Sequence, residues 1–191
     1  MDPSEFKNLH RDRRVFLIGN GPSLNQTPLD SLQDECTIAM NRISLVYQRV
    51  QWRPSYFVCT TTNIGRPDWK QDILETIGLG VPSFVWSELR EYVGPRPNVV
   101  YVSCTHGEEV TNDAPLEWWS YDISDRVCKF GTSMLVALQI AVYMGFRKIY
   151  LLGCDLGYTS QANSGVGRVL VRVLRKIGLT LWDPNHFDPT Y

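Results

Sequence analysis

The sequence predicts an α/β fold of the Rossmann-like type, with a mostly parallel sheet that carries helices on both faces. Three observations predict it. Short apolar runs alternate with helix-like segments along the chain. The first run, Val15 to Ile18, is apolar at every position, which is typical of a strand buried on both faces. Several of the runs end directly in glycine or asparagine, as at Gly19 and Asn41. Strand and helix in alternation favour parallel pairing through right-handed crossovers.

Length and composition agree with one globular domain. The chain has 191 residues, of which 43% are hydrophobic and 20% charged, and a domain of this size buries roughly 70% of its unfolded surface. We therefore expect a single domain over residues 1–191. The formal charge of -1 gives no overall attraction for nucleic acid or for an anionic membrane. Any bound anion must therefore be held by local groups.

Cysteine usage and hydropathy place the protein in a reducing, aqueous compartment. The five cysteines are widely spaced and lie mostly inside apolar runs, without the CxxC spacing of a metal site or the pattern of a disulfide framework. No apolar stretch reaches the ~20 residues that span a bilayer. We expect a cytoplasmic protein without a transmembrane segment, and homo-oligomer formation stays open.

The first half of the chain is predicted to alternate strands with short helices. The run from Val15 to Ile18 forms a strand that enters a glycine-rich loop at once. Thr27 is expected to cap a short helix through Leu32, with Pro28 at its first position. The remaining predicted elements of this half are strands at Thr37–Met40 and Tyr56–Cys59 and a helix at Asp68–Ile77.

The second half is predicted to close the sheet. Strands are expected at Val81–Trp86 and Val99–Ser103, with a turn-rich segment between them. Thr105 to Lys129 is polar and aromatic without periodicity, which predicts an irregular insertion. Ser133 to Met144 is small and apolar nearly all round, which indicates a buried helix. Gly145 ends it, and a strand follows at Lys148–Leu152.

Polar residues follow several predicted strands at the point where each strand ends. The carboxyl ends of parallel strands meet at one edge of the sheet, where α/β proteins bind ligands. We therefore expect these side chains to converge on one crevice. The alternative at any single position is turn chemistry, because glycine, asparagine and serine are what tight turns require. The residues are Asn20 and Ser23, Asn41 and Arg42, Thr60 to Asn63, and Cys154 and Asp155.

Two glycine turns are candidate phosphate sites. The loop Gly19-Asn20-Gly21-Pro22-Ser23-Leu24 has neither the dinucleotide-binding GxGxxG spacing nor the P-loop spacing. A second turn, Gly131-Thr132-Ser133, opens the buried helix and offers hydroxyls and backbone N–H groups at its positive end. Ser133 is alternatively an N-cap residue.

The terminal segment offers a candidate base, and the sequence offers no metal site. His186 lies among asparagine and aspartate residues in Asn185-His186-Phe187-Asp188-Pro189-Thr190-Tyr191, as a general base does. No DxD pair is present, and Asp155 has no neighbouring carboxylate. We therefore expect no metal ligands.

The motifs together resemble those of the bacterial sialyltransferases of glycosyltransferase family 42. They also resemble the related motility-accessory-factor glycosyltransferases and archaeal 6-hydroxymethylpterin diphosphokinases. The resemblance runs in motif order through nearly the whole chain. It implies a Rossmann-like fold, a CMP-activated sugar as substrate, and no metal or other cofactor. The motifs are GNGPSL at 19–24, MNR at 40–42, GTSMLVALQIAVYMGFRKIYLLGCDLGY at 131–158 and NHFDPTY at 185–191.

The resemblance also implies roles for individual residues. Asn20, Gly21 and Ser23 would approach the phosphate and ribose of the nucleotide, and Asn41 would contact the donor. Thr132 and Ser133, after Gly131, would hold the nucleotide. Tyr158 would stabilise the departing phosphate, although it lies one residue further beyond the aspartate than in the family. His186 matches the first of two family histidines, and Thr190 occupies the position of the second.

Three functions follow as hypotheses. The first is a metal-independent glycosyltransferase that transfers a sugar from a CMP-linked donor to a glycan or other hydroxyl, with His186 as base. The second is a pterin-type diphosphokinase using ATP and Mg²⁺, with Asp155 and Asp188 as ligands. The third is a nucleotide-binding domain without catalysis, which Thr190 permits. We also expect that sequence beyond Tyr191 is missing.

Overall fold

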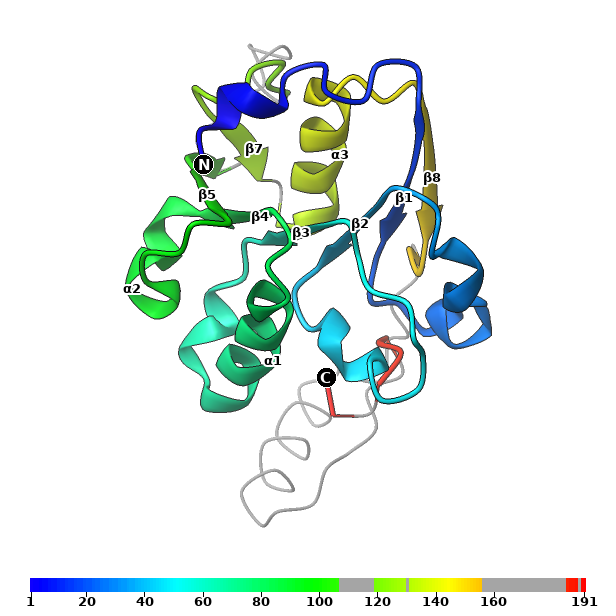
Figure 1. The fold of residues 1–191 in the computed structure, drawn as a ribbon. Coiled ribbons are helices and arrows are strands. Elements are labelled where there is room, and N and C mark those ends of the chain that lie inside the picture. Colours follow the sequence, from blue (N-terminus) through cyan, green and yellow to red (C-terminus); the bar gives the residue numbers. More distant parts are fainter. Residues whose placement is uncertain (107–118, 130, 156–184, 189) are drawn as a thin grey trace.

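A six-stranded parallel sheet forms the centre of the protein. The computed structural model describes residues 1–106, 119–129, 131–155, 185–188 and 190–191. The strands lie in the order β5-β4-β3-β2-β1-β8, and all neighbouring pairs are parallel (Figure 1). This confirms the predicted α/β class. The strands are β1 (Arg14–Ile18), β2 (Thr37–Met40), β3 (Tyr56–Cys59), β4 (Ser83–Trp86), β5 (Val99–Val102) and β8 (Lys148–Leu152).

The direction of winding reverses beside β1. The chain moves outward from β1 through β5, and β8 then lies on the other side of β1. Ile18 at the end of β1 is in register with Leu152 at the end of β8, so the loops that begin at Gly19 and Gly153 start at the same level. Such a reversal point leaves a crevice outside the carboxyl ends of the two strands. The fold therefore places its natural ligand crevice beside the GNGPSL loop.

One principal helix covers each face of the sheet. Helix α3 (Ser133–Tyr143) and helix α1 (Pro67–Gly78) lie on opposite sides of the strands (Figure 1). The strand residues divide between two apolar clusters with a period of two. In β2, Ile38 and Met40 belong to the cluster that contains α3, and Ala39 belongs to the cluster that contains α1. The prediction of helices on both faces is confirmed.

A small second sheet replaces part of the predicted irregular insertion. Strands β6 (Cys104–His106) and β7 (Val127–Lys129) pair in parallel. Gln139 on α3 holds β7 in place, because its Nε2 donates to the Cys128 carbonyl at 2.8 Å and its Oε1 accepts from the Cys128 amide at 2.9 Å. The prediction of irregular structure was wrong here. Strands of three residues are too short to show periodicity in a sequence.

One predicted helix start is shifted by one residue, and the alternative of Ser133 as an N-cap residue is wrong. The helical turn η3 (Leu29–Leu32) begins after Pro28, and the Thr27 hydroxyl donates to the Ser23 carbonyl at 3.2 Å instead of capping it. At α3, Thr132 is the N-cap residue, since its hydroxyl accepts from the Met134 amide at 3.2 Å. The Ser133 hydroxyl is thereby available for contacts across the sheet edge.

The remaining described elements are short. None of the described helices has the length and apolar character needed to cross a bilayer. All five cysteines are free thiols, and Cys36, Cys59 and Cys128 are buried. The short elements are α2 (Arg90–Val93) and the 3₁₀ turns η1 (Pro3–Phe6), η2 (Pro22–Gln26), η4 (Ile43–Val46), η5 (Thr62–Gly65) and η6 (Ser87–Leu89).

Candidate functional site

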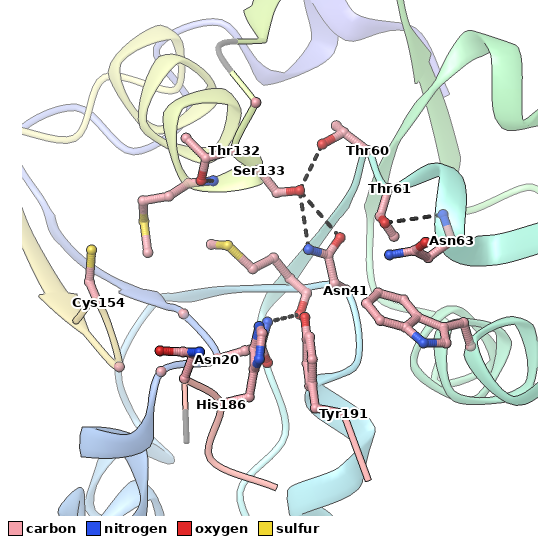
Figure 2. A pocket seen from close by; sticks show the side chains of 18 of the residues that line it. Asn20, Asn41, Thr60, Thr61, Asn63, Thr132, Ser133, Cys154, His186 and Tyr191 are labelled. Carbon is pink, nitrogen blue, oxygen red and sulfur yellow. Dashed lines mark hydrogen bonds between the residues drawn. The ribbon is translucent and has the colours of Figure 1, made fainter. Parts of the chain in front are cut away.

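A cleft of about 830 Å³ opens at the carboxyl edge of the sheet. Its walls come from the loops after β1, β2, β3 and β8, the start of α3, and the terminal segment (Figure 2). Most residues of the predicted site line this cleft. Ser23 and Arg42 do not line it, and Tyr158 lies outside the described residues. The predicted residues in its lining are Asn20, Gly21, Asn41, Thr60 to Asn63, Gly131, Thr132, Ser133, Cys154, Asp155 and His186.

The floor of the cleft is a close crossing of the loops after β1 and β8. The Gly19 amide donates to the Leu152 carbonyl and the Gly21 amide to the Gly153 carbonyl, both at 2.8 Å. A Cβ on Gly19 would stand 2.3 Å from the Gly153 carbonyl oxygen, far inside contact distance. Gly153 has φ +60°, which favours glycine. Glycine at these two positions is therefore required for the close approach of the loops after β1 and β8.

The carboxylate of Asp155 occupies the donors of the GNGPSL loop. Its Oδ2 accepts from the Ser23 amide at 3.0 Å and from the Ser23 hydroxyl at 2.9 Å. The loop thus binds an anionic group, as the sequence suggested, but the group belongs to the chain itself. Phosphate binding by Gly21 and Ser23 stays a prediction, since the Gly21 amide and the Ser23 amide and hydroxyl all donate to the loop after β8.

Asn20 carries a buried acceptor without a hydrogen-bond partner. Its Nδ2 donates to the Met40 carbonyl at 3.0 Å, and its own carbonyl accepts from the Phe187 amide at 3.0 Å. Its side-chain Oδ1 has no hydrogen-bond partner among the residues that the structure describes. Leaving a buried acceptor unpaired costs about 1–3 kcal/mol. Such an atom beside a cleft indicates a position where a ligand donor would be bound.

Asn41, Ser133 and Thr60 form a hydrogen-bonded group at the centre of the cleft (Figure 2). The Ser133 and Thr60 hydroxyl oxygens are 2.7 Å apart, and Asn41 Nδ2 donates to the Ser133 hydroxyl at 3.2 Å. Asn41 has φ +52°, a left-handed conformation that asparagine tolerates better than most residues. This backbone turn directs the amide of Asn41 from the end of β2 toward the start of α3.

Lys129 supplies a cation that the sequence analysis did not identify. Its Nζ donates to the Thr60 carbonyl and lies 4.1 Å from the centroid of the Trp86 ring. Burial lowers the pKa of Lys129 below its ordinary value. The charged residues that line the cleft are Lys129, Arg66 and Asp155. A lysine two positions before the glycine of the second turn was the available sequence signal.

The terminal segment carries His186 into the cleft. The His186 and Tyr191 rings stack with centroids 3.8 Å apart and planes inclined by 11°. Thr190 is exposed and does not line the cleft. Its hydroxyl donates to the Asp188 carboxylate. The residue at the position of the second family histidine therefore faces away from the candidate site.

The predicted Mg²⁺ ligands of the diphosphokinase hypothesis are engaged elsewhere. The Asp155 carboxylate accepts from Ser23, and the Asp188 carboxylate accepts from the Thr190 amide at 2.9 Å. Within the part of the chain that the structure describes, no three histidine, cysteine, aspartate or glutamate residues are grouped to hold a metal ion.

Comparisons with known proteins gave one kind of match. No family model matches the sequence, and no curated protein matches it. Among solved structures, the chain is similar to the sialyltransferase CstII from Campylobacter jejuni, which was solved in complex with a substrate analogue, cytidine-5'-monophosphate. The two are 13% identical, the match covers 94% of this chain and 87% of that chain, and the TM-score is 0.43.

Proposed function

We propose that this chain is a metal-independent, sialyltransferase-like glycosyltransferase that uses a CMP-linked sugar. One observation carries the proposal. Motif residues from separate segments of the sequence, among them Asn20, Asn41, Ser133 and His186, line the same cleft at the reversal point of the sheet. A volume of about 830 Å³ also lies within the roughly 300–1,000 Å³ of small-molecule sites.

The donor nucleotide is assigned to the groups between Asn20 and α3. The unpaired Oδ1 of Asn20 would accept from the nucleoside. The phosphate would lie toward the start of α3, where the helix dipole is positive, and toward the ammonium group of Lys129. The hydrogen-bonded Asn41 and Ser133 hold this end of the cleft rigid. Preorganised donors of this kind stabilise the negative charge of a leaving phosphate.

The chemistry proposed for this cleft is a displacement at the anomeric carbon of the donor sugar. The acceptor hydroxyl oxygen forms the new glycosidic bond, and its proton passes to the His186 imidazole. The bond between the anomeric carbon and the phosphate oxygen breaks, and its electron pair leaves with CMP. Lys129 and the start of α3 stabilise that charge. Tyr158 is retained as a phosphate contact on the resemblance alone.

Nucleotide titration tests the binding half of the proposal. We would titrate the protein with CMP, CDP, UDP and GDP by calorimetry, in EDTA and then in Mg²⁺. The proposal expects CMP to bind best and equally well in both buffers. The matched control is Thr132→Ser, which keeps a hydroxyl N-cap, beside Ser133→Ala, which removes the hydroxyl shared with Thr60 and Asn41. Absence of binding by all four nucleotides would remove the proposal.

Transfer activity tests the catalytic half. The assay follows release of CMP from a CMP-linked sialic acid with glycan acceptors, for the native chain and His186→Asn. We expect on the order of 10²–10⁴-fold slower turnover in the variant, the range of general-base contributions. CMP binding without turnover would favour the non-catalytic domain, and Mg²⁺-dependent ATP binding would favour the diphosphokinase.

A further inference from the structure

Arg42 is a buried cation next to the cleft that the proposed chemistry does not use. It follows Asn41 at the end of β2, and its side chain is 4% exposed. It is absent from the cleft lining, so it is not placed to touch a substrate. A buried guanidinium needs partners that offset the loss of hydration. The partners of Arg42 therefore indicate which segments of the protein its side chain holds together.

The guanidinium of Arg42 joins helix α1 to the terminal segment. Its Nε donates to the Asp72 carboxylate at 2.6 Å, and its Nη1 donates to the Thr190 carbonyl at 2.6 Å. The Asp68 carboxylate stands 3.8 Å from Nη1. The carboxylates therefore fix the guanidinium on α1, and the guanidinium in turn fixes the backbone of Thr190.

The residue after Thr190 is the one on which His186 stacks. The Tyr191 ring lies 5.7 Å from the centre of the Arg42 guanidinium and packs edge-on against Trp69 on α1, with centroids 5.1 Å apart. The Tyr191 ring also meets the Phe187 ring edge-on, with centroids 6.3 Å apart, and stacks face to face with the His186 ring at 3.8 Å. The Tyr191 ring thus supports one face of the imidazole, and Arg42 and α1 support Tyr191.

The far end of the same segment is held independently. The Phe187 amide donates to the Asn20 carbonyl at 3.0 Å, and the Phe187 carbonyl accepts from Asn25 at 2.8 Å. Phe187 itself is 2% exposed. Loss of Arg42 would therefore remove a support of Tyr191 and of the Thr190 carbonyl, while the backbone next to His186 stays in place. We therefore expect the loss of Arg42 to change the orientation of the His186 imidazole and to leave the contacts of Phe187 intact.

We propose that Arg42 is a positioning residue for His186, acting through the Thr190 carbonyl and the stacked ring of Tyr191. The catalytic consequence rests on the function proposed above, in which His186 is the base, whereas the geometric statement does not. A lysine would not replace Arg42 fully, because an ammonium is a point charge, whereas the planar guanidinium presents separate N–H groups to a carboxylate and a carbonyl at once.

The geometric statement is tested by NMR on the nucleotide-free protein. The chain has three histidines, and His186→Asn identifies the His186 Cε1 proton. Stacked on Tyr191, this proton is shielded by the ring and shows cross-relaxation with the Tyr191 ring protons. We expect Arg42→Met to move it downfield and remove the cross-peaks, and Arg42→Lys to give a smaller shift. The control is Arg90→Met, whose arginine lies 4.0 Å over the Tyr101 ring and does not line the cleft.

The catalytic consequence is tested by separating kcat from KM. Arg42 does not line the cleft, so Arg42→Met should leave the KM for the CMP-sugar within about twofold. A misplacement of the base by 1 Å costs on the order of 10²-fold in rate, so kcat should fall by about that factor. Arg42→Lys should recover part of the loss, and Arg90→Met should match the native chain.

Each outcome decides between the two claims. An unchanged His186 signal in a folded Arg42→Met protein overturns the positioning role, whatever the activity. If Arg42→Met does not fold, Tyr191→Leu replaces it, because that change removes the stacked ring without burying a charge or releasing one. A displaced His186 signal in a protein without any transferase activity keeps the positioning role and counts against the proposed function.

Discussion

Replacing Gly19 by alanine tests why the GNGPSL motif begins with glycine. We infer that glycine is needed here because the loops after β1 and β8 cross closely, and not because a phosphate binds. A Cβ at this position would lie 2.3 Å from the Gly153 carbonyl oxygen and 3.2 Å from the Met134 side chain. The carbonyl is backbone and cannot rotate away. The ends of β1 and β8 would have to separate by roughly 1 Å to reach normal contact.

The loss of stability follows from this clash. Overpacking a filled site costs about 1–3 kcal/mol. Separating the strands also weakens the bond from the Gly19 amide to the Leu152 carbonyl, which has a net value of about 0.5–1.5 kcal/mol. We therefore expect Gly19→Ala to lower the free energy of unfolding by about 2–4 kcal/mol. In a domain of this size each kcal/mol lowers Tm by about 2–4 °C.

Thermal unfolding without nucleotide is the appropriate assay, with Gly78→Ala as the matched control. Gly78 lies at the end of α1, and a Cβ there would meet no atom within 4 Å. Alanine should be neutral or stabilising by about 0.5–1 kcal/mol in a helix. If Gly19→Ala kept the native Tm and lost only CMP binding, the glycine would serve the ligand and the reasoning from chain contact would be refuted.

Three further changes test the site and its surroundings. Ser133→Ala should destabilise the protein by about 1–3 kcal/mol, because it leaves the buried Thr60 hydroxyl without its 2.7 Å partner; denaturant unfolding measures this, and a Ser133→Thr variant that retains a hydroxyl should lose less. Burial lowers the pKa of Lys129, so CMP affinity should fall as pH rises through that lowered pKa, and calorimetry across pH should show no such fall in Lys129→Met. Burial also lowers the pKa of His10, so the unfolded chain takes up the proton first and stability should fall as pH drops below the ordinary histidine pKa; a His10→Phe variant, which loses the 2.6 Å contact with Tyr56, should unfold with a flatter pH profile.

The sequence predicted the sheet because each central strand is apolar on both faces. Runs such as Thr37–Met40 are buried at every position, so no other arrangement would remove them from water. The short strands β6 and β7 could not be predicted in this way. They depend on Gln139, whose side chain bonds to both backbone groups of Cys128 from a helix more than ten residues away. A long-range polar contact of this kind has no local sequence pattern.

Most of the cleft lining was predictable because asparagine, serine and glycine follow the strands directly. Asn20 and Asn41 come together because the carboxyl ends of parallel strands share one edge, and Ser133 reaches Asn41 from the start of α3. Lys129 was missed as a functional residue, and Arg42 was expected in the crevice but lies outside its lining, because the role of each depends on burial and on partners. Lysine and arginine are usually exposed, and nothing local in the sequence marks these two as buried.

The pairing of Asp155 with Ser23 constrains how a nucleotide would lie in the cleft. The carboxylate already accepts from the amide and hydroxyl of Ser23, so a phosphate beside it would meet a like charge and lack those donors. The opposite end of the cleft has the ammonium group of Lys129 and the positive end of α3. Sugar hydroxyls, in contrast, donate well to carboxylates. Under the proposed function, the nucleotide would therefore bind with its ribose near Asp155 and its phosphate near Lys129. The glycine loop would then shape the cleft, and the start of α3 would bind the negatively charged phosphate.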